Sequence, residues 1–437
     1  MNNNCTKLGI TNWRNENKEF YIKDEDRLGH IYAIGKTGVG KSTLLLNLAI
    51  SDIKRGNGLC IIDPHGDLVE TILNQIPIER IDDVIYFNPK DQNFPIGFNP
   101  LKGIHPNFHN LVTSGLISIF KKIWSESWGP RLEYILKYSI LTLLEYPDAT
   151  LLDIQPLLTN PQFRENVLSK VRNQHAISFW KNEFEKYNST FRNESITPIL
   201  NKTGVFLTNN ILRNIVGQKV RSFRMQNVID GKKILLVNLS KGEIGEDVSA
   251  ILGNIIINSI QLAASYRASI PEKDRVPFYL YIDEMHSFVS LSLIDILSEA
   301  RKYKLSIFLT HQYLDQIDEK ISNAILGNIG TLISFRIGAK DADKLEKEFF
   351  PIFTNRDLIN LPRYNMYLKL MINGATSRPF SAYSLAPTIL KEPFKNDIIK
   401  LSQKKYGRQK EEIEKSILMK YQDKKDENIQ NGLFDKS

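Results

Sequence analysis

Short apolar runs alternate with amphipathic stretches along most of the chain. Six of the runs have the length of buried strands, and they cover residues 30–34, 59–63, 233–238, 277–283, 305–310 and 331–336. Between the first two, leucines recur at helical spacing over 44–48, and Lys54-Arg55-Gly56 is typical of a helix C-terminus. Strands that alternate with helices favour a parallel sheet of the doubly wound α/β class.

A central block interrupts this alternation. Apolar residues there fall on single helical faces, at 116, 119, 120, 123 and 124 and again at 132, 135, 136, 140 and 143. The segments 163–184 and 196–215 have a weaker helical pattern. Because no strong β-run interrupts residues 107–227, we interpret them as an all-helical domain inserted into the α/β domain.

The C-terminal part contains a predicted hairpin and a charged tail. Residues 366–372 and 379–385 have strand patterns on either side of Asn373-Gly374, a turn signal. After Pro387 the chain is charged and repetitive, which is typical of a solvated helix followed by disorder. The expected organisation is a lead-in over 1–29, the α/β domain over 30–106 and 228–386, the helical insertion over 107–227, and the tail over 387–437.

Composition narrows the function classes without selecting one. The chain has 437 residues, a net charge of +8 and two cysteines, which excludes a disulfide framework and a cysteine zinc cluster and fits a reducing cytoplasm. The excess of basic residues permits a polyanionic partner but does not demand one. The longest apolar run, 251–264, is shorter and more polar than the roughly 20 residues that span a bilayer, so we expect no membrane span.

The strongest chemical signal is a phosphate-binding loop between the first strand and its helix. Its pattern is GxxxxGK[ST], and its residues are Gly35, Lys36, Thr37, Gly38, Val39, Gly40, Lys41, Ser42 and Thr43. The glycines let backbone N–H groups point at one anion, and the start of the following helix adds partial positive charge. Lys41 is expected to reach the β- and γ-phosphates of ATP, and the Ser42 hydroxyl to coordinate Mg²⁺.

Adjacent acids at the end of another strand supply the expected catalytic groups. Asp283 ends the run 277–283, at the strand edge where ligands bind in such sheets, and Glu284 follows it. Asp283 is predicted to hold Mg²⁺ and Glu284 to polarise the attacking water. Gln312, just past the strand 305–310, either orients water or senses the γ-phosphate, or it is an ordinary polar strand end. Arg301 is either a solvated cation or an arginine finger for a neighbouring subunit.

Three further features allow simpler explanations. Asp63-Pro-His-Gly-Asp67 offers metal-ligand chemistry, but its proline and glycine favour a turn. His105 and His109 are four residues apart without evident further ligands, so we expect no metal other than Mg²⁺. A basic stretch could contact DNA or be a solvated face, and its members are Arg213, Lys219, Arg221 and Arg224.

Taken together, these motifs resemble the TraD/TraG-type coupling ATPases of conjugative type IV secretion, within the FtsK/HerA group of P-loop motors. The resemblance covers roughly residues 10–385, and the order of the motifs carries it: IGKTGVGKST at 34–43, IIDPHGDL at 61–68, YFNP at 86–89, FNPL at 98–101, WGPRLEYIL at 128–136, LLVNLSKG at 235–242, YIDEMHSF at 281–288 and SEARKYKLSIFLTHQYLDQI at 298–317. It implies a RecA-like P-loop NTPase fold with an inserted all-helical domain for substrate recognition.

The resemblance also implies roles for residues and partners. Lys41 and Ser42 would hold ATP and Mg²⁺, Asp283 and Glu284 would be the metal and catalytic acids, and Gln312 would be the sensor. Arg301 falls where these ATPases place a finger that acts in trans. The expected assembly is a ring hexamer with DNA in its channel, working with relaxosome and type IV secretion proteins.

The expected function is therefore ATP-driven DNA translocation in the cytoplasm. Membrane-bound coupling proteins begin with membrane helices, whereas 34 residues precede Gly35 here, so we expect recruitment by a membrane subunit rather than direct anchoring. One alternative is a HerA-like translocase in DNA end processing or phage defence, which a neighbouring nuclease gene would favour. Another is a nucleotide-controlled adaptor that docks proteins, which would lack DNA-stimulated turnover.

Overall fold

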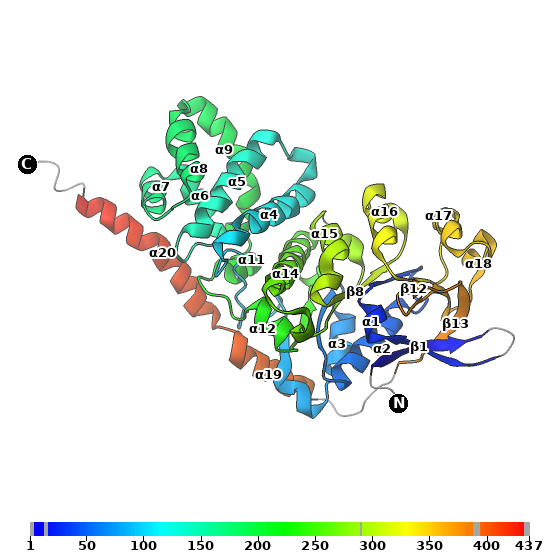
Figure 1. Ribbon diagram of the computed structural model, residues 1–437. Helices are drawn as coiled ribbons and strands as arrows, with labels where there is room; N and C mark the ends of the chain where they lie inside the picture. Colours follow the sequence, from blue (N-terminus) through cyan, green and yellow to red (C-terminus); the bar gives the residue numbers. More distant parts are fainter. Residues whose placement is uncertain (1–3, 13–15, 289–290, 388–393, 432–437) are drawn as a thin grey trace, which may run out of the picture. The chain divides into compact units, whose positions relative to one another are not determined.

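The chain folds as two compact units in a computed structural model that describes residues 4–12, 16–288, 291–387 and 394–431 (Figure 1). The first unit comprises residues 1–87, 225–242 and 263–402, and the second comprises residues 88–224, 243–262 and 403–437.

The first unit is built on one mixed sheet of eleven strands in the order β2-β1-β13-β10-β9-β3-β8-β7-β4-β6-β5. The strands from β9 to β5 in this order are parallel, and the pairs from β2 to β9 are antiparallel. Their bounds are β1 Cys5–Thr11, β2 Glu19–Lys23, β3 Ile31–Ile34, β4 Gly58–Asp63, β5 Val84–Phe87, β6 Ile234–Asn238, β7 Phe278–Ile282, β8 Leu305–His311, β9 Thr331–Ser334, β10 Asn365–Lys369 and β13 Phe380–Ser384.

The six predicted strands and the hairpin are confirmed. The two hairpin arms pair as β10 and β13, and a smaller hairpin of β11 (Met371–Ile372) and β12 (Ala375–Thr376) extends from them around Asn373-Gly374. Three strands of the main sheet were missed, as was the two-residue β12. β1 and β2 lie in the predicted lead-in, where polar residues alternate with buried ones, and β5 is only four residues long.

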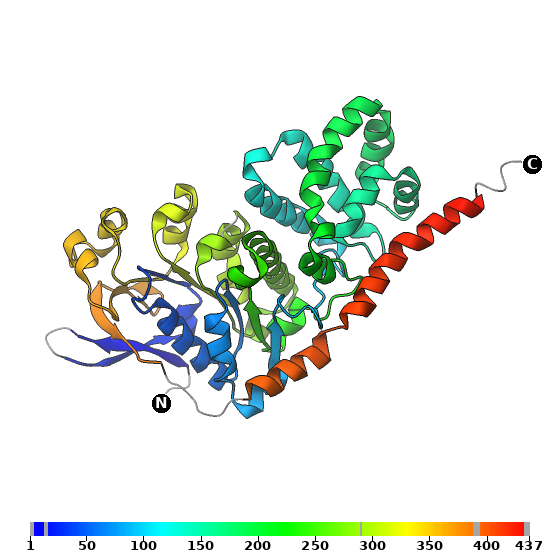
Figure 2. The same ribbon diagram turned by 180° about the vertical axis from the view of Figure 1, so that it is seen from behind.

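Helices α2 (Lys41–Lys54) and α3 (Asp67–Leu73) pack on the sheet, α2 against β1, β4 and β8 and α3 against β4 and β6 (Figure 2). Both bury leucine and isoleucine side chains, including Leu44, Leu48 and Ile72, in one large core. That packing sets the angle at which the loop before α2 approaches the strand ends.

A buried ion pair joins the predicted lead-in to this core. Arg27, at the end of the short helix α1 (Asp24–Arg27), donates to both carboxylate oxygens of Asp52 on α2 at 2.7 and 2.8 Å. The same guanidinium donates to the hydroxyl of Tyr281 on β7 at 2.7 Å, and that hydroxyl donates to Asp52. These three buried side chains therefore tie α2 to the strand that precedes Asp283.

The apolar helix α14 (Glu246–Tyr266) is longer than the sequence pattern predicted. Together with the turn that follows, it forms a helical segment over Glu246–Ser269 that is long and apolar enough to cross a membrane by length and composition. The apolar run recognised in the sequence covered only the 14 residues 251–264. Since 83% of its most apolar stretch of 18 residues is buried inside the protein, we interpret α14 as a core helix.

The second unit is mainly helical. The main helices of its central block are α4 His109–Ile123, α5 Pro130–Glu145, α6 Ile154–Thr159, α7 Pro161–Leu168, α9 Ser189–Thr203 and α11 Asn210–Val216. Aromatic rings form much of its core: Phe120 stacks on Trp124 with centroids 5.1 Å apart, and Trp180 meets Phe184 at 4.8 Å. The helical character predicted for this block is confirmed.

The charged tail buries some of its side chains, whereas a solvated helix would expose them all. It forms α19 (Lys395–Tyr406) and α20 (Lys410–Asn431). Ile398 is buried in the core of the first unit, and Ile413 and Ile417 are buried on α20. The prediction of a solvated helix is therefore wrong for these segments, because isoleucines at helical spacing mark a packed face. The end predicted to be disordered, after 431, lies outside the described residues.

Candidate nucleotide site

The phosphate-loop sequence connects the end of β3 to the start of α2. Gly38 and Gly40 have φ angles of 74° and 121°, which side-chain-bearing residues rarely adopt. A Cβ on Gly35 would lie 2.6 Å from the Cβ of Phe335. Gly38 and Gly40 therefore permit the backbone to turn tightly, Gly35 permits a close approach to Phe335, and the N-terminus of α2 closes the cradle that results. This cradle fits a nucleotide's phosphates.

Lys41 lies buried at the base of the cradle. Its ammonium donates to the carbonyl oxygens of Gly35 at 2.5 Å and Lys36 at 3.1 Å. Burial lowers the pKa of Lys41, while the nearby carboxylates of Glu284 and Asp283 act to raise it. The ammonium is thus held between the loop and the acidic strand end, where it can reach a bound phosphate.

Ser42 and Asp283 meet across the site. The Ser42 hydroxyl lies 3.4 Å from Asp283 Oδ2, although 241 residues separate them in the chain. The other oxygen, Oδ1, accepts hydrogen bonds from the Thr310 hydroxyl and from the Glu284 backbone N–H. Burial raises the pKa of Asp283, and the Glu284 charge raises it further. A hydroxyl and a carboxylate oxygen at this spacing are ligands suited to Mg²⁺.

Glu284 is held in a strained conformation beside these groups. Its φ and ψ are 45° and 59°, a left-handed conformation that costs a non-glycine residue roughly 1–3 kcal/mol. Its backbone N–H donates to Thr310 Oγ1 at 3.0 Å. Gln312 donates to its Oε1 at 2.9 Å, and His286 Nδ1 lies 3.5 Å from its Oε2. These contacts fix the carboxylate of a nearly buried acid at the edge of the sheet.

Comparison with known proteins identifies the family. The sequence profile of the type IV secretion-system coupling protein DNA-binding domain matches residues 20–350. The chain belongs to this family. The type 4 coupling protein DotL of Legionella pneumophila is 22% identical over 405 residues, covering 78% of this chain and 51% of DotL. The chain thus spans about half the length of that relative.

Solved structures of coupling proteins share the fold. The plasmid coupling protein TrwB in complex with ADP and Mg²⁺ is similar with a TM-score of 0.63 at 18% identity, covering 87% of this chain and 90% of that one. VirB4 of Thermoanaerobacter pseudethanolicus has a TM-score of 0.59 at 14% identity, covering 87% and 96%. The predicted coupling-protein family and its α/β P-loop fold are therefore confirmed.

The predicted arginine finger lies away from the residues that the site brings together. Arg301 is exposed on the turn Ala300–Tyr303, just before β8 begins, whereas Gln312 follows the end of that strand. Arg301 precedes β8 and Gln312 follows it. Because the seven residues of β8 span about 23 Å, the two residues lie at opposite ends of that strand. Arg301 therefore cannot reach the phosphates held by its own chain. Its role in trans stays a prediction.

The motif at residues 63–67 is a turn. The Asp63 carboxylate accepts backbone N–H groups from His65 at 2.9 Å, Leu68 at 2.9 Å and Val69 at 3.1 Å. Asp63 therefore ends β4 and caps the entry to α3. This geometry supports the structural alternative that the proline and glycine favoured.

Two members of the predicted basic stretch have partners within the second unit. Arg221 donates to the carbonyl oxygens of Asn99 and of Pro100, the latter at 2.8 Å. Arg213 lies 3.3 Å from the Glu414 carboxylate. The Glu414 carboxylate offsets the charge of Arg213, and the carbonyl contacts occupy donors of Arg221 that a DNA phosphate would otherwise take. Arg224, by contrast, is exposed.

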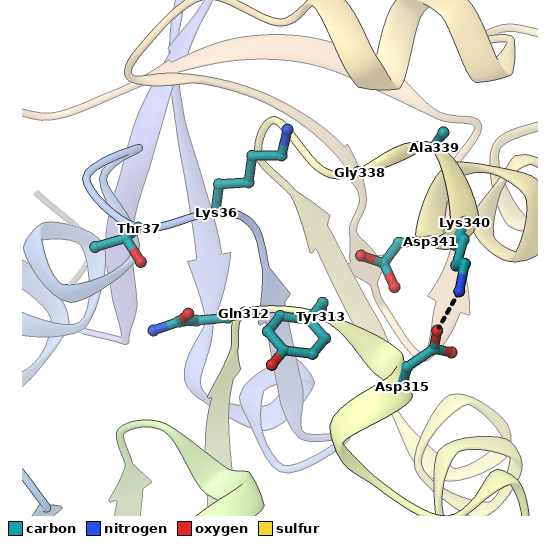
Figure 3. A pocket seen from close by; sticks show the side chains of 9 residues that line it. All are labelled: Lys36, Thr37, Gln312, Tyr313, Asp315, Gly338, Ala339, Lys340 and Asp341. Carbon is teal, nitrogen blue, oxygen red and sulfur yellow. Dashed lines mark ion pairs between the residues drawn. The ribbon is translucent and has the colours of Figure 1, made fainter.

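A pocket of about 470 Å³ opens beside the phosphate loop. Figure 3 shows Lys36 and Thr37 from the loop, Gln312 and Tyr313 from the end of β8, and the segment that follows β9. Lys340 and Asp315 form an ion pair on its rim at 3.8 Å. The pocket leaves space for a side chain or ligand group between the phosphate loop and Gln312.

Sequence reasoning missed Thr310 and His286. Thr310 is buried at the end of β8 and bridges Asp283 to Glu284. A polar residue near the end of an apolar strand, beside the predicted sensor, was the available signal. His286 had no signal beyond its nearness to Glu284 in the sequence.

Proposed function

We propose that the protein is an ATP-driven DNA translocase of the coupling-protein type. The observation that carries this proposal is the clamped Glu284 carboxylate, which lies beside Asp283, Ser42 and Lys41 at the edge of the sheet. A protein that only binds a nucleotide as a switch has less need of a strained, hydrogen-bonded acid at this position.

Each residue has a distinct task in hydrolysis. Lys41 neutralises charge on the β- and γ-phosphates, and the loop N–H groups orient them. Ser42 and Asp283 would hold Mg²⁺, which supplies further charge neutralisation when bound. Glu284 accepts a proton from the attacking water, and Gln312 sets the direction of the Glu284 carboxylate.

A complete site would need a second copy of the chain. Because Arg301 and Gln312 lie at opposite ends of β8, Arg301 would have to act as an arginine finger on the site of a neighbouring subunit. The exposure of Arg301 supports this role. We therefore propose a closed ring, of which a hexamer is the expected form, with ATP bound between subunits.

The partners follow from the family. The matched profile is that of a DNA-binding domain, so we propose that hydrolysis moves DNA and that the helical block contributes to substrate recognition. Relaxosome and type IV secretion proteins are the expected partners. We further propose that the protein acts at the cytoplasmic face of the membrane.

The test is the steady-state ATPase rate of the purified chain with no DNA, single-stranded DNA and double-stranded DNA across a salt series. We expect DNA to stimulate turnover and salt to remove the stimulation, because phosphate contacts release counterions. Glu284→Gln should abolish turnover while ATP still binds. Active turnover that DNA does not change would contradict the motor and favour a protein-docking adaptor. Retained turnover in Lys41→Ala would reject the site itself.

A further inference from the structure

Tyr364 occupies an unusual backbone position beside the phosphate loop. The Asn365 N–H donates to the Pro362 carbonyl at 3.3 Å, which closes a four-residue turn with Tyr364 at its third position. Tyr364 has a φ of 65°. Glycine or asparagine is usual at such a position, and a bulky aromatic residue there is strained.

The backbone of Tyr364 is attached to the phosphate loop. Its N–H donates to the carbonyl oxygen of Val39 at 3.0 Å, and its carbonyl accepts the N–H of Ser384 at 2.8 Å. The turn is therefore held between the loop and the end of β13.

The side chain of Tyr364 lies over the last glycine of the loop. A Cβ built on Gly40 would lie 3.2 Å from Cδ1 of the tyrosine ring and 3.4 Å from the hydroxyl oxygen of Ser384. The tyrosine is 51% exposed, so burial in a core does not explain the strain. The Ser384 hydroxyl oxygen is buried and makes no hydrogen bond within the described residues. An exposed aromatic face and a buried polar atom therefore lie together at this end of the loop.

The order of strands shows which end of a nucleotide this is. Glu284 and Gln312 follow β7 and β8, which lie on one side of β3 in the sheet, and they would act on the γ-phosphate. The nucleoside must then extend from the opposite end of the phosphate chain. Tyr364 directly precedes β10, and Ser384 is the last residue of β13. Both strands lie on the other side of β3 in the sheet.

We infer that Tyr364 is the base-stacking residue of the nucleotide site and that Ser384 offers its hydroxyl to the nucleoside. This inference rests on the proposed nucleotide-hydrolysing function and adds the part of the site that holds the base. Stacking on an aromatic face tolerates any base, so purine nucleotides of either kind are expected to bind, and pyrimidine nucleotides more weakly because their rings are smaller.

The test separates binding of the base from binding of the phosphates. The affinity of the full chain for ADP and for pyrophosphate is measured by calorimetry in Tyr364→Gly, which suits the positive φ and removes the ring. Tyr364→Phe keeps the ring, and Lys304→Gly, at a φ of 52° before β8, controls for relieved strain. We expect Tyr364→Gly to weaken ADP binding about 5- to 100-fold and to leave pyrophosphate binding and the melting temperature nearly unchanged. Tyr364→Phe and Lys304→Gly should bind both ligands like the wild type.

Two results would overturn the inference. One is unchanged ADP affinity in Tyr364→Gly. The other is an equal loss of ADP and pyrophosphate, which would mean that Tyr364 only shapes the loop. If the glycine variant is unstable, Tyr364→Asn tolerates the same φ and replaces it in the comparison. Lys41→Ala distinguishes the underlying proposal: it should lose both ligands, and if it binds them normally the nucleotide site itself is misplaced.

Discussion

Removing the Thr310 hydroxyl should weaken both the Mg²⁺ dependence of turnover and the stability of the fold. In Thr310→Val the side chain keeps its shape, but Asp283 loses a buried donor to Oδ1 and the Glu284 N–H loses an acceptor at 3.0 Å. Asp283 Oδ1 keeps only the Glu284 N–H, at 3.2 Å. The Asp283 carboxylate is then free to rotate away from Ser42.

The size of the effect follows from the kind of hydrogen bond. A hydrogen bond to a charged group contributes about 1.5–3 kcal/mol, which is the expected loss in free energy of unfolding. Groups that orient a metal ligand typically change metal affinity or activity about 10- to 100-fold, so the Mg²⁺ concentration for half-maximal ATPase should rise by a similar factor.

The assay is an Mg²⁺ titration of ATPase rate at saturating ATP, with thermal unfolding measured in parallel. Thr310→Ser keeps the hydroxyl and should restore the wild-type Mg²⁺ dependence. An unchanged Mg²⁺ titration in Thr310→Val, with or without a loss of stability, would refute the idea that Thr310 orients Asp283. Equal losses in the valine and serine variants would mean that packing, rather than the hydroxyl, is responsible.

Three further predictions concern other parts of the first unit. Arg301→Ala should stop turnover but spare ATP binding, and mixing it with Glu284→Gln subunits should restore some activity in a ring; absence of rescue would leave the trans role without support. Burial lowers the pKa of His30 to about 4, so the protein should lose about 1.4 kcal/mol of stability per pH unit as pH falls from 6.5 towards that value. His30→Asn should flatten this slope in denaturant unfolding, and a slope that stays equal to that of the wild type would contradict the assignment. Asp52→Asn should destabilise the protein by about 3–5 kcal/mol, because it leaves a buried guanidinium unpaired, and a loss below about 1 kcal/mol by chemical unfolding would refute that reading.

The direction of this pH effect follows from where His30 carries its proton in the folded protein. His30 accepts the Ile307 N–H through Nδ1 at 3.2 Å, so its Nε2 carries the proton that is shared with the Leu297 carbonyl at 3.1 Å. The folded protein therefore holds this ring neutral below the pH at which an unfolded histidine takes up a second proton. Stability is full above about pH 6.5 and falls as the unfolded state binds protons that the folded state excludes.

Much of the candidate site could be predicted because its chemistry is local. The phosphate loop needs glycines, a lysine and a hydroxyl within a few consecutive residues, and the acidic pair needs only to end an apolar strand. Gln312 was predicted as one of two alternatives, and the hydrogen bond to Glu284 now supports the sensor role. The strands β1 and β2 could not be predicted with equal ease, because an edge strand with one polar face has a weak pattern.

The hydrophobic pattern and the order of motifs were enough to establish the α/β class, the helical block, the phosphate loop and the coupling-protein family. Each of these depends on residues close together in the chain or on their order along it. Three-dimensional packing was needed to bring Thr310 between Asp283 and Glu284, to bury Arg27 against Asp52, and to put Tyr364 over Gly40. These contacts join residues from separate strands and helices, so they depend on the order of strands in the sheet, which no local pattern encodes.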